Sequence, residues 1–207
     1  MKTATEVGGD YYDFYKNDSN ELTAVIGDAT GHGMDAGMLV SVSKGLFQNL
    51  AGQSDLYEIV SQFNTSLLSM KLQPMYMSLC CLRILDKQIQ IIGAGMPPTL
   101  YYNCVKNSIE EIEASGPPLG GFPNFGYEIN KYELSKGDVI ILMSDGFSER
   151  MNNKKEIFGW NKGKELLSQM NYLSSDQIVR EFVKVNDEWG GTREQDDDIT
   201  IVVLKVK

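Results

Sequence analysis

Short apolar or alternating segments recur along most of the chain and predict β-strands. Groups of turn residues separate them, such as NDSN at residues 17–20 and KGD at residues 136–138. Because adjacent strands joined by short turns pair as hairpins, we expect mainly antiparallel sheets. The predicted strands are Asp10–Tyr15, Leu22–Gly27, Met77–Leu85, Gln88–Gly93, Thr99–Asn103, Tyr127–Leu134, Val139–Met143 and Ile199–Val206.

A first pair of helices is predicted between the second and third strands. The segment Asp35–Ala51 is rich in small and apolar residues with few charges, so we expect it to be buried. The segment Asp55–Lys71 carries apolar side chains at helical spacing, which predicts a helix that faces the core. Ser54 is the expected N-cap of this second helix.

A second pair of helices is predicted near the end of the chain, at Trp160–Met170 and Ser175–Trp189, with Ser174 or Ser175 as a cap. Grouped strands with paired helices indicate an α+β sandwich, with helices outside and sheets inside. No internal repeat or low-complexity segment interrupts the chain. We therefore expect residues 1–207 to form one domain.

The composition is that of an ordinary globular protein with an acidic balance. The chain has 207 residues, of which 42% are apolar and 10% aromatic, enough for one sizeable core. Its formal charge of −9, from 28 acidic and 19 basic residues, argues against nucleic acid or an anionic membrane as the main partner. No apolar run has the length of a membrane span, and no signal peptide precedes the first motif. We expect a cytoplasmic segment without membrane contact.

The cysteines and the histidine do not indicate a zinc site. Cys80 and Cys81 are adjacent in an apolar run that predicts a buried strand, and the third cysteine is Cys104. No CxxC pair occurs, and His32 is the only histidine. We expect reduced thiols, as in cytosolic proteins.

Acidic residues at the ends of predicted strands carry the main chemical signal. They lie in GGDYYDF, IGDATGHG, ILMSDGFSE and DDDITIVVL. One aspartate at a strand end is usually a turn residue, but four in such contexts indicate a magnesium or manganese site, because oxygen ligands suit these cations. The acids of the last segment also repel one another unless a cation neutralises them. The candidates are Asp10, Asp28, Asp145 and either Asp197 or Asp198.

The segment IGDATGHGMDAGM follows a predicted strand and opens a predicted helix. The amides of Gly31 and Gly33 could approach a phosphate or a metal-bound water there, and the alternative is a glycine-rich packing turn in which Asp28 helps to cap the helix. The glycine spacing does not match the dinucleotide fingerprint, and the GK[ST] of the Walker motif is absent. His32 is either a general acid near the metal site or a cap of the helix.

Seven segments together resemble the bacterial type-2C (PPM) protein phosphatases of the RsbU/SpoIIE-like branch. They are GGDYYDF, GDATGHG, GAGMPPTLYY, GPPLGGF, KGDVIILMSDGFSE, IFGW and DDDITIVVL, in family order from Glu6 to Leu204. The resemblance implies a four-layer α-β-β-α sandwich of two antiparallel sheets flanked by helix pairs. It also implies a phosphoserine/phosphothreonine phosphatase that uses two Mn²⁺ or Mg²⁺ ions and a metal-activated water.

The resemblance assigns ligand roles by motif. Asp28 would bridge both ions, and Asp145 with Asp197 would complete one site. Asp10 and the backbone carbonyl of Ala29 would serve the other, partly through water. Asp198 is the alternative to Asp197.

Other positions extend the ligand set or depart from the family pattern. Glu149 lies four residues after Asp145, where an acid would act beside the ligands or hold a third ion. Eukaryotic members hold the phosphate with an arginine shortly before the first metal motif, whereas residues 3–5 here are Thr-Ala-Thr. Met96 stands where bacterial relatives often have histidine. We therefore expect metal and backbone groups to hold the phosphate.

The resemblance also implies partners. The substrate would be a phosphorylated protein, an anti-sigma-factor antagonist in partner-switching control of transcription. The chain would be the catalytic part of a longer protein with an upstream sensor or receiver domain, or the cytoplasmic part of a larger sensor. The Asp35–Lys71 helices would form a regulatory surface and a homodimer contact. A pseudophosphatase that binds without turnover and another metal-dependent hydrolase remain alternatives, although the acids at all four ligand positions disfavour the first.

Overall fold

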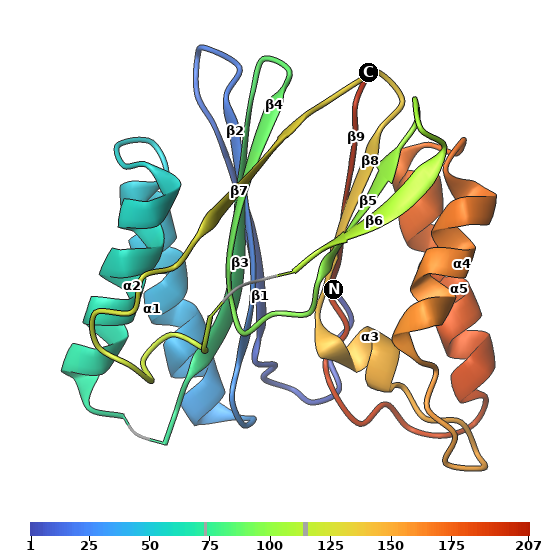
Figure 1. The fold of residues 1–207 in the computed structure, drawn as a ribbon. Helices are drawn as coiled ribbons and strands as arrows, with labels where there is room; N and C mark the ends of the chain where they lie inside the picture. Colours follow the sequence, from blue (N-terminus) through green and yellow to red (C-terminus); the bar gives the residue numbers. More distant parts are fainter. Residues whose placement is uncertain (73, 114–115) are drawn as a thin grey trace. The chain divides into compact units, whose positions relative to one another are not determined.

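The computed structural model describes residues 1–72, 74–113 and 116–207 and divides the chain into two compact units (Figure 1). The five-stranded unit comprises Thr5–Met96 and Glu113–Glu133, and the four-stranded unit comprises Met1–Ala4, Pro97–Ile112 and Leu134–Lys207. Among the described residues each unit contains one antiparallel sheet, with two helices in the five-stranded unit and three in the four-stranded unit, which confirms the predicted α+β class. That residues 1–207 form one catalytic domain of a longer protein stays a prediction.

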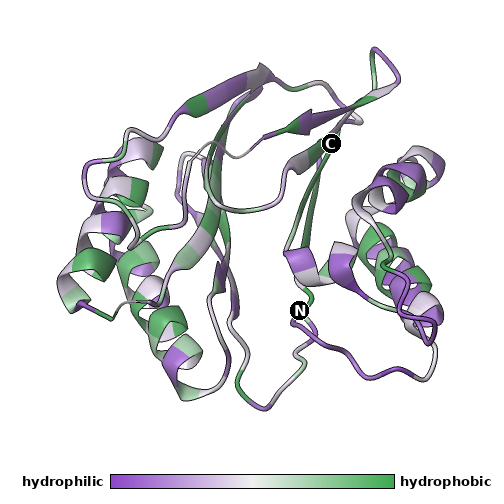
Figure 2. Ribbon diagram, turned by 60° about the horizontal axis from the view of Figure 1, so that its bottom comes forward, coloured by the Kyte–Doolittle hydropathy of each residue, from purple (hydrophilic) through white to green (hydrophobic). Residues whose placement is uncertain are grey.

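The sheet of the five-stranded unit has the order β1-β2-β3-β4-β7, and every pair of neighbours is antiparallel. Short turns join β1 to β2 and β3 to β4, as expected for hairpins, whereas two helices lie between β2 and β3. Apolar residues dominate the central strands of the sheet, whereas the helices alternate apolar and polar residues (Figure 2). The strands are β1 (Asp10–Lys16), β2 (Leu22–Ala29), β3 (Met77–Leu85), β4 (Gln88–Ala94) and β7 (Ile129–Glu133).

Helix α1 (Met34–Leu50) packs one face on this sheet and leaves the other in solvent. Its buried positions include Leu39, Phe47 and Leu50, at the spacing of one helix face. The prediction that Asp35–Ala51 is buried is wrong for its outer face, because Met38 is 43% exposed and Lys44 and Gln48 are exposed as well. A helix with few charges can therefore still have an open face.

Helix α2 (Leu56–Met70) buries the predicted apolar positions, among them Ile59, Val60 and Phe63. The predicted cap is wrong by one residue. Asp55, not Ser54, is the N-cap, and its side chain accepts a hydrogen bond from the amide of Glu58 at 2.8 Å. A carboxylate at this position also interacts favourably with the positive end of the helix dipole.

The sheet of the four-stranded unit has the order β6-β5-β8-β9 and is also antiparallel. A stacked pair of rings, Phe147 and Phe182 with centroids 5.6 Å apart, lies in its core with the buried Phe158. The elements are β5 (Thr99–Asn103), β6 (Ser108–Ile112), β8 (Val139–Met143), α3 (Asp145–Glu149), α4 (Trp160–Met170), α5 (Ser175–Gly190) and β9 (Ile201–Lys205).

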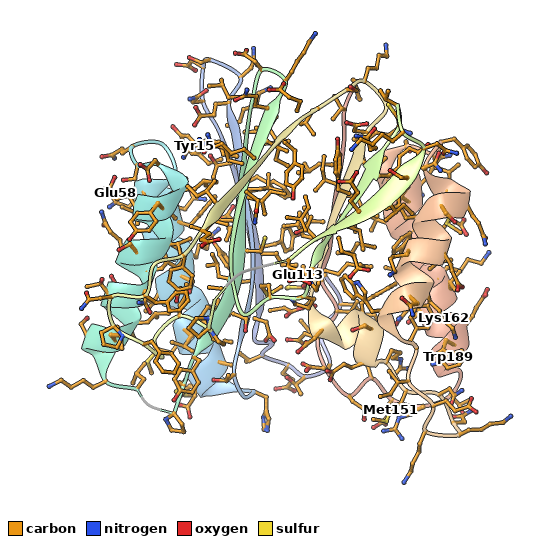
Figure 3. All side chains as sticks on the ribbon, viewed as in Figure 1. Tyr15, Glu58, Glu113, Met151, Lys162 and Trp189 are labelled. Atoms are coloured by element: carbon orange, nitrogen blue, oxygen red, sulfur yellow. The ribbon has the colours of Figure 1, made fainter. Side chains whose placement is uncertain are left out.

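Both ends of α5 are fixed by side chains. Ser174 and Gln177 form a capping box at the start, which confirms the predicted cap. At the other end Trp189 packs edge-on against Phe158 with ring centroids 5.9 Å apart, and the ammonium of Lys162 lies over the Trp189 ring at 3.1 Å (Figure 3). These contacts join the end of α5 to the start of α4.

Two elements of the four-stranded unit were not predicted. Strand β6 reads SIEEI, and its adjacent acids hide the alternation. Helix α3 reads DGFSE, a segment typical of a turn. Within the described ranges, no helix is both long enough and apolar enough to cross a bilayer.

Candidate functional site

The acids of the five-stranded unit lie on neighbouring strands. Asp10 is the first residue of β1, Asp28 is the last but one of β2, and the two are direct partners in the antiparallel register. Directly opposite residues on adjacent strands have Cβ atoms about 4.5–5.5 Å apart on the same face of the sheet. Asp10 is only 4% exposed. The β-ladder therefore fixes the spacing of the two carboxylates through the main chain.

Glycine at position 9 keeps the space beside the carbonyl of Ala29 open. The amide of Ala29 donates to the carbonyl of Gly9 at 3.0 Å, which brings the two backbones together. A Cβ at residue 9 would lie 2.8 Å from the carbonyl oxygen of Ala29, closer than real Cβ atoms come. The GGD motif thus has a steric reason, and the carbonyl proposed as a ligand lies where no side chain from residue 9 can cover it.

The loop after β2 contains two glycines in the left-handed region, Gly31 at φ 87° and Gly33 at φ 76°. The amide of Gly33 donates to the carbonyl of Val7 at 3.3 Å, so the loop is attached to the segment before β1. Gly33 is the N-cap of α1, and no side chain caps this helix. The interpretation of the exposed His32 as a helix cap is therefore wrong, while its role as a general acid stays a prediction.

The acids of the four-stranded unit include Asp145 and Glu149, which lie one helical turn apart on α3. Burial raises the pKa of Asp145, and the charge of Glu149 raises it further, against the opposing effect of the Gly146 amide. Glu149 itself is exposed. The carboxylate of Asp145 thus lies in a partly dry, negatively charged environment.

Asp197 and Asp198 precede β9 in a segment without regular structure, and their carboxylates have different environments. Partial burial raises the pKa of the Asp197 carboxyl; the Asp198 amide opposes this rise, and the charges of Asp145, Asp198 and Asp196 add to it. Asp198 is 5% exposed, and its Oδ1 accepts a hydrogen bond from the amide of Ala4 at 2.7 Å. The charge of Asp145 therefore acts on the Asp197 carboxylate, while the Asp198 carboxylate holds the N-terminal segment through the amide of Ala4.

Glycine at position 146 allows the Asp198 backbone to approach α3. A Cβ at residue 146 would lie 2.0 Å from the carbonyl oxygen of Asp198, an impossible contact. Ser144, the N-cap of α3, makes two hydrogen bonds to Thr200. Its hydroxyl accepts from the amide of Thr200 at 2.9 Å, and its amide donates to the carbonyl of Thr200 at 3.0 Å. Sequence reasoning placed the DG pair at a strand end but missed this close packing, which depends on residues more than fifty positions later.

The four candidate aspartates are divided two and two between the units, Asp10 and Asp28 in one and Asp145 and Asp197 in the other. Within the part of the chain that the structure describes, no three acidic, histidine or cysteine side chains form a group that could hold a metal ion. The donors are all hard oxygens, the class that Mg²⁺ and Mn²⁺ prefer. In chemistry the two pairs fit these cations, although neither pair alone completes a coordination shell.

Comparison with known proteins identifies the family. The family model described as Stage II sporulation protein E (SpoIIE) matches residues 18–207, so the chain belongs to the SpoIIE family. It is a PP2C-type phosphatase domain of the RsbU/SpoIIE-like branch. It is similar to the phosphoserine phosphatase RsbU of Bacillus subtilis (strain 168), with 26% identity over 212 residues, 99% of this chain and 61% of that protein. The chain therefore spans about three fifths of this relative.

Solved structures support the fold. The SiaA-PP2C domain of Pseudomonas aeruginosa superposes with a TM-score of 0.87 at 19% identity, covering 100% of this chain and 84% of that one. RsbX in complex with magnesium superposes with a TM-score of 0.74 at 18% identity, covering 100% of this chain and 92% of that one. The chain has the PP2C-type α+β fold, with two antiparallel sheets and flanking helices.

Proposed function

We propose that this chain is a Mn²⁺- or Mg²⁺-dependent protein phosphatase that hydrolyses phosphoserine or phosphothreonine. One observation carries the proposal: Asp10 and Asp28 are direct cross-strand partners beside the Ala29 carbonyl, which Gly9 leaves uncovered. Membership of the SpoIIE family supports it, as does the similarity to a relative named phosphoserine phosphatase.

We infer that Asp10, Asp28, Asp145 and Asp197, with the carbonyl of Ala29, hold two cations, and that Asp28 is shared by both. Like-charged carboxylates that face each other across strands destabilise a protein, and a divalent cation relieves this repulsion. On the other unit, burial raises the pKa of Asp145 and of Asp197, and the charges of neighbouring acids raise both further. Similarity to RsbX, solved with magnesium, supports the choice of cation.

Within the four-stranded unit we prefer Asp197 to Asp198 as the ligand. Each carboxylate accepts one backbone amide, but Asp198 is 5% exposed and its bond holds Ala4 of the N-terminal segment. Asp197 is exposed, and its bond to the Asp198 amide stays within its own loop. Glu149 lies one turn from Asp145 and is exposed, so it is our candidate for a water-mediated contact or a third ion.

When bound, the cations neutralise the phosphoryl oxygens and lower the pKa of a coordinated water, so no covalent nucleophile from the protein is needed. The other steps belong to the chain. The carboxylates orient the reacting centre, and the amide of Gly31 in the glycine-rich loop contacts the phosphate in place of the absent arginine. The amide of Gly33 does not take this role, because it donates to the carbonyl of Val7. His32, exposed on the same loop, donates a proton to the leaving serine or threonine oxygen.

We propose a phosphorylated anti-sigma-factor antagonist as the substrate, and regulation by an upstream sensor or receiver domain. RsbU is a longer protein, of which this chain covers 61%, and this supports a regulated arrangement. The α1–α2 pair offers a surface for homodimerisation, since Met34, Met38 and Tyr57 are exposed at 84%, 43% and 46%. Met38→Asp should weaken self-association in sedimentation measurements; unchanged association, or unaltered activation of a longer form by its upstream domain, would contradict this surface.

The proposed reaction is tested with wild-type protein, nitrophenyl phosphate and a phosphoserine peptide. Hydrolysis should require Mn²⁺ or Mg²⁺, stop with chelator and return when the cation is restored. Tight peptide binding without turnover would identify a pseudophosphatase. Activity on nucleotides or phosphodiesters but not on the peptide would identify a different hydrolase.

A further inference from the structure

The segment of residues 191–198 needs a fixed conformation although it contains no helix or strand. It joins the end of α5 to the start of β9 and carries Asp197. Within it, Arg193 and Asp196 form an exposed bidentate ion pair at 2.8–3.1 Å, which ties the loop only to itself. The side-chain amide of Gln195 donates to the carbonyls of Lys2 and Asp197 at 2.9 and 2.7 Å. None of these contacts connects the loop to α3, the helix that carries Asp145.

Arg150, the residue after α3, makes that connection. It is only 6% exposed, and its guanidinium donates one hydrogen bond to the carbonyl of Glu194 and one to the carbonyl of Arg193, both at 2.5 Å. Its own carbonyl accepts from the amide of Phe158 at 2.8 Å. Its Nε has no hydrogen-bond partner among the described residues. A buried arginine is costly unless its donors are used, so the two contacts to successive carbonyls are a specific arrangement.

The end of α5 is shaped to accept this side chain. A Cβ at Gly190 would lie 2.3 Å from a terminal nitrogen of Arg150 and 2.5 Å from its Nε. Gly190 is the last residue of α5, and its φ is not in the left-handed region, so the backbone alone does not require glycine there. The requirement for a small residue comes from the guanidinium. Asn186, one turn earlier on α5, also holds α3, donating to the carbonyl of Phe147 at 2.8 Å.

Next to the guanidinium is a cavity of about 120 Å³, lined by Arg150, Gly146, Glu149, Met151, Asp196 and Asp197 among others. Met151 is labelled in Figure 3 and marks this region of the unit. Arg150 thus lines the same cavity as Glu149 of α3 and Asp197 of the loop. The arginine is therefore adjacent to Asp197 as well as to the backbone that precedes it.

We propose that Arg150 is a positioning residue, which with Gly190 fixes the Asp197 loop against α3 and so sets the spacing of Asp145 and Asp197 for the cation. The role in cation binding rests on the proposed function. The hydrogen bonds from Arg150 to the carbonyls of Arg193 and Glu194, called the Arg150 brace below, form without metal. Lysine cannot replace the arginine, because one ammonium lacks the planar fork that reaches two neighbouring carbonyls.

The test uses Arg150→Met, Arg150→Lys and Gly190→Ala. The matched controls are Arg180→Met, an exposed arginine on α5, and Gly163→Ala, a helical glycine in the same unit whose Cβ would make ordinary contacts at 3.5 Å. The first readout is hydrogen exchange of the amides of residues 193–197 in chelated protein. The second is the Mn²⁺ dissociation constant from calorimetry, alongside kcat and KM.

We expect both Arg150→Met and Gly190→Ala to speed exchange of this loop and to weaken Mn²⁺ binding roughly 10–100-fold, the usual effect of losing a residue that orients a metal ligand. Arg150→Lys should restore only part of the loss. Gly190→Ala should add little in the Arg150→Met background, because the two changes remove the same contact.

Loop exchange and Mn²⁺ affinity in Arg150→Met equal to those in Arg180→Met would overturn the proposal, as would full recovery with lysine. If Arg150→Met does not fold, Arg150→Lys and Gly190→Ala carry the same comparison. A wild-type protein that binds no Mn²⁺ would refute the proposed function instead, while the exchange measurements would still decide whether the Arg150 brace exists.

Discussion

The two acidic pairs are held in place by different means. Asp10 and Asp28 are fixed by main-chain pairing of β1 with β2, where each side chain inherits its position from the ladder. Asp145 lies on a five-residue helix and Asp197 in a segment without regular structure, so side-chain contacts and one close glycine must hold them. The first arrangement depends on hydrogen bonds that almost any sequence can make. The second depends on the identity of particular residues, and it should be more sensitive to substitution.

The largest expected effect is on catalysis and should be similar for both pairs. Asp28→Asn and Asp145→Asn each remove a charged ligand, so kcat should fall by more than the roughly 10–100-fold that residues behind a metal ligand cost. Steady-state assays with Mn²⁺ measure the loss, with the exposed turn residue Asp18→Asn as the control. Near-normal turnover in Asp28→Asn would contradict its assignment as the shared ligand.

Stability should separate the pairs. Gly146→Ala places a Cβ 2.0 Å from the carbonyl oxygen of Asp198, whereas Gly9→Ala places one 2.8 Å from that of Ala29. Overpacking commonly costs about 1–3 kcal/mol, and we expect the Gly146 variant at or above the top of that range and the Gly9 variant near its lower end. Urea unfolding of chelated protein measures both. Equal losses would show that the loop-borne pair is no more sensitive than the ladder-borne pair.

The contrast between these pairs also explains what the sequence could predict. Strands β3, β5 and β8 and helix α4 have the predicted bounds, because apolar runs between clear turn residues specify them locally. The adjacency of Asp10 and Asp28 follows from two strands joined by a short turn. These features need only neighbouring residues.

Features that depend on distant residues could not be predicted. Nothing local distinguishes Asp197 from Asp198; the difference comes from Ala4, which is 194 positions away. The guanidinium of Arg150 meets carbonyls 43 and 44 positions later, and no spacing rule indicates that loop. The DG pair is typical of a turn, and helix α3 forms there because Phe147 stacks on Phe182 of α5 and Gly146 lies against the backbone of Asp198.

Asp138, also in the four-stranded unit, has its pKa shifted in the opposite direction from that of Asp145. Asp138 is fully buried and accepts hydrogen bonds from the amides of Cys104 and Ser135 and from the hydroxyl of Tyr101, all at 2.8 Å. Burial alone would raise the pKa of Asp138, but these donors outweigh it and lower the pKa below its usual value. We expect Asp138→Asn to cost about 1.5–3 kcal/mol at neutral pH, the worth of hydrogen bonds to a charged group.

The pH dependence of that cost has a definite sign. Because the folded pKa is lowered, the stabilisation by Asp138 is complete above the ordinary aspartate pKa of about 4 and is lost as the pH falls through the lower folded pKa. The difference in unfolding free energy between wild type and Asp138→Asn should therefore shrink below about pH 4. A difference that grew towards low pH would show that the carboxylate is not stabilised by its donors.

The smallest expected effect concerns Asp145 itself, and it runs in the other direction. In chelated protein, Asp145→Asn should raise the free energy of unfolding by roughly 0.2–0.5 kcal/mol, since it removes a repulsion from Glu149 one turn away. Glu149→Gln removes the same repulsion from the partner side and should give a gain of similar size. With Mn²⁺ the order should reverse, because wild type gains about 2.7 kcal/mol at a cation concentration 100 times the dissociation constant and the Asp145 variant gains less. Urea unfolding with and without the cation gives all of these values. If Asp145→Asn were destabilised without metal, its carboxylate would be a structural group, and the distinction between Asp145 and Asp138 would fail.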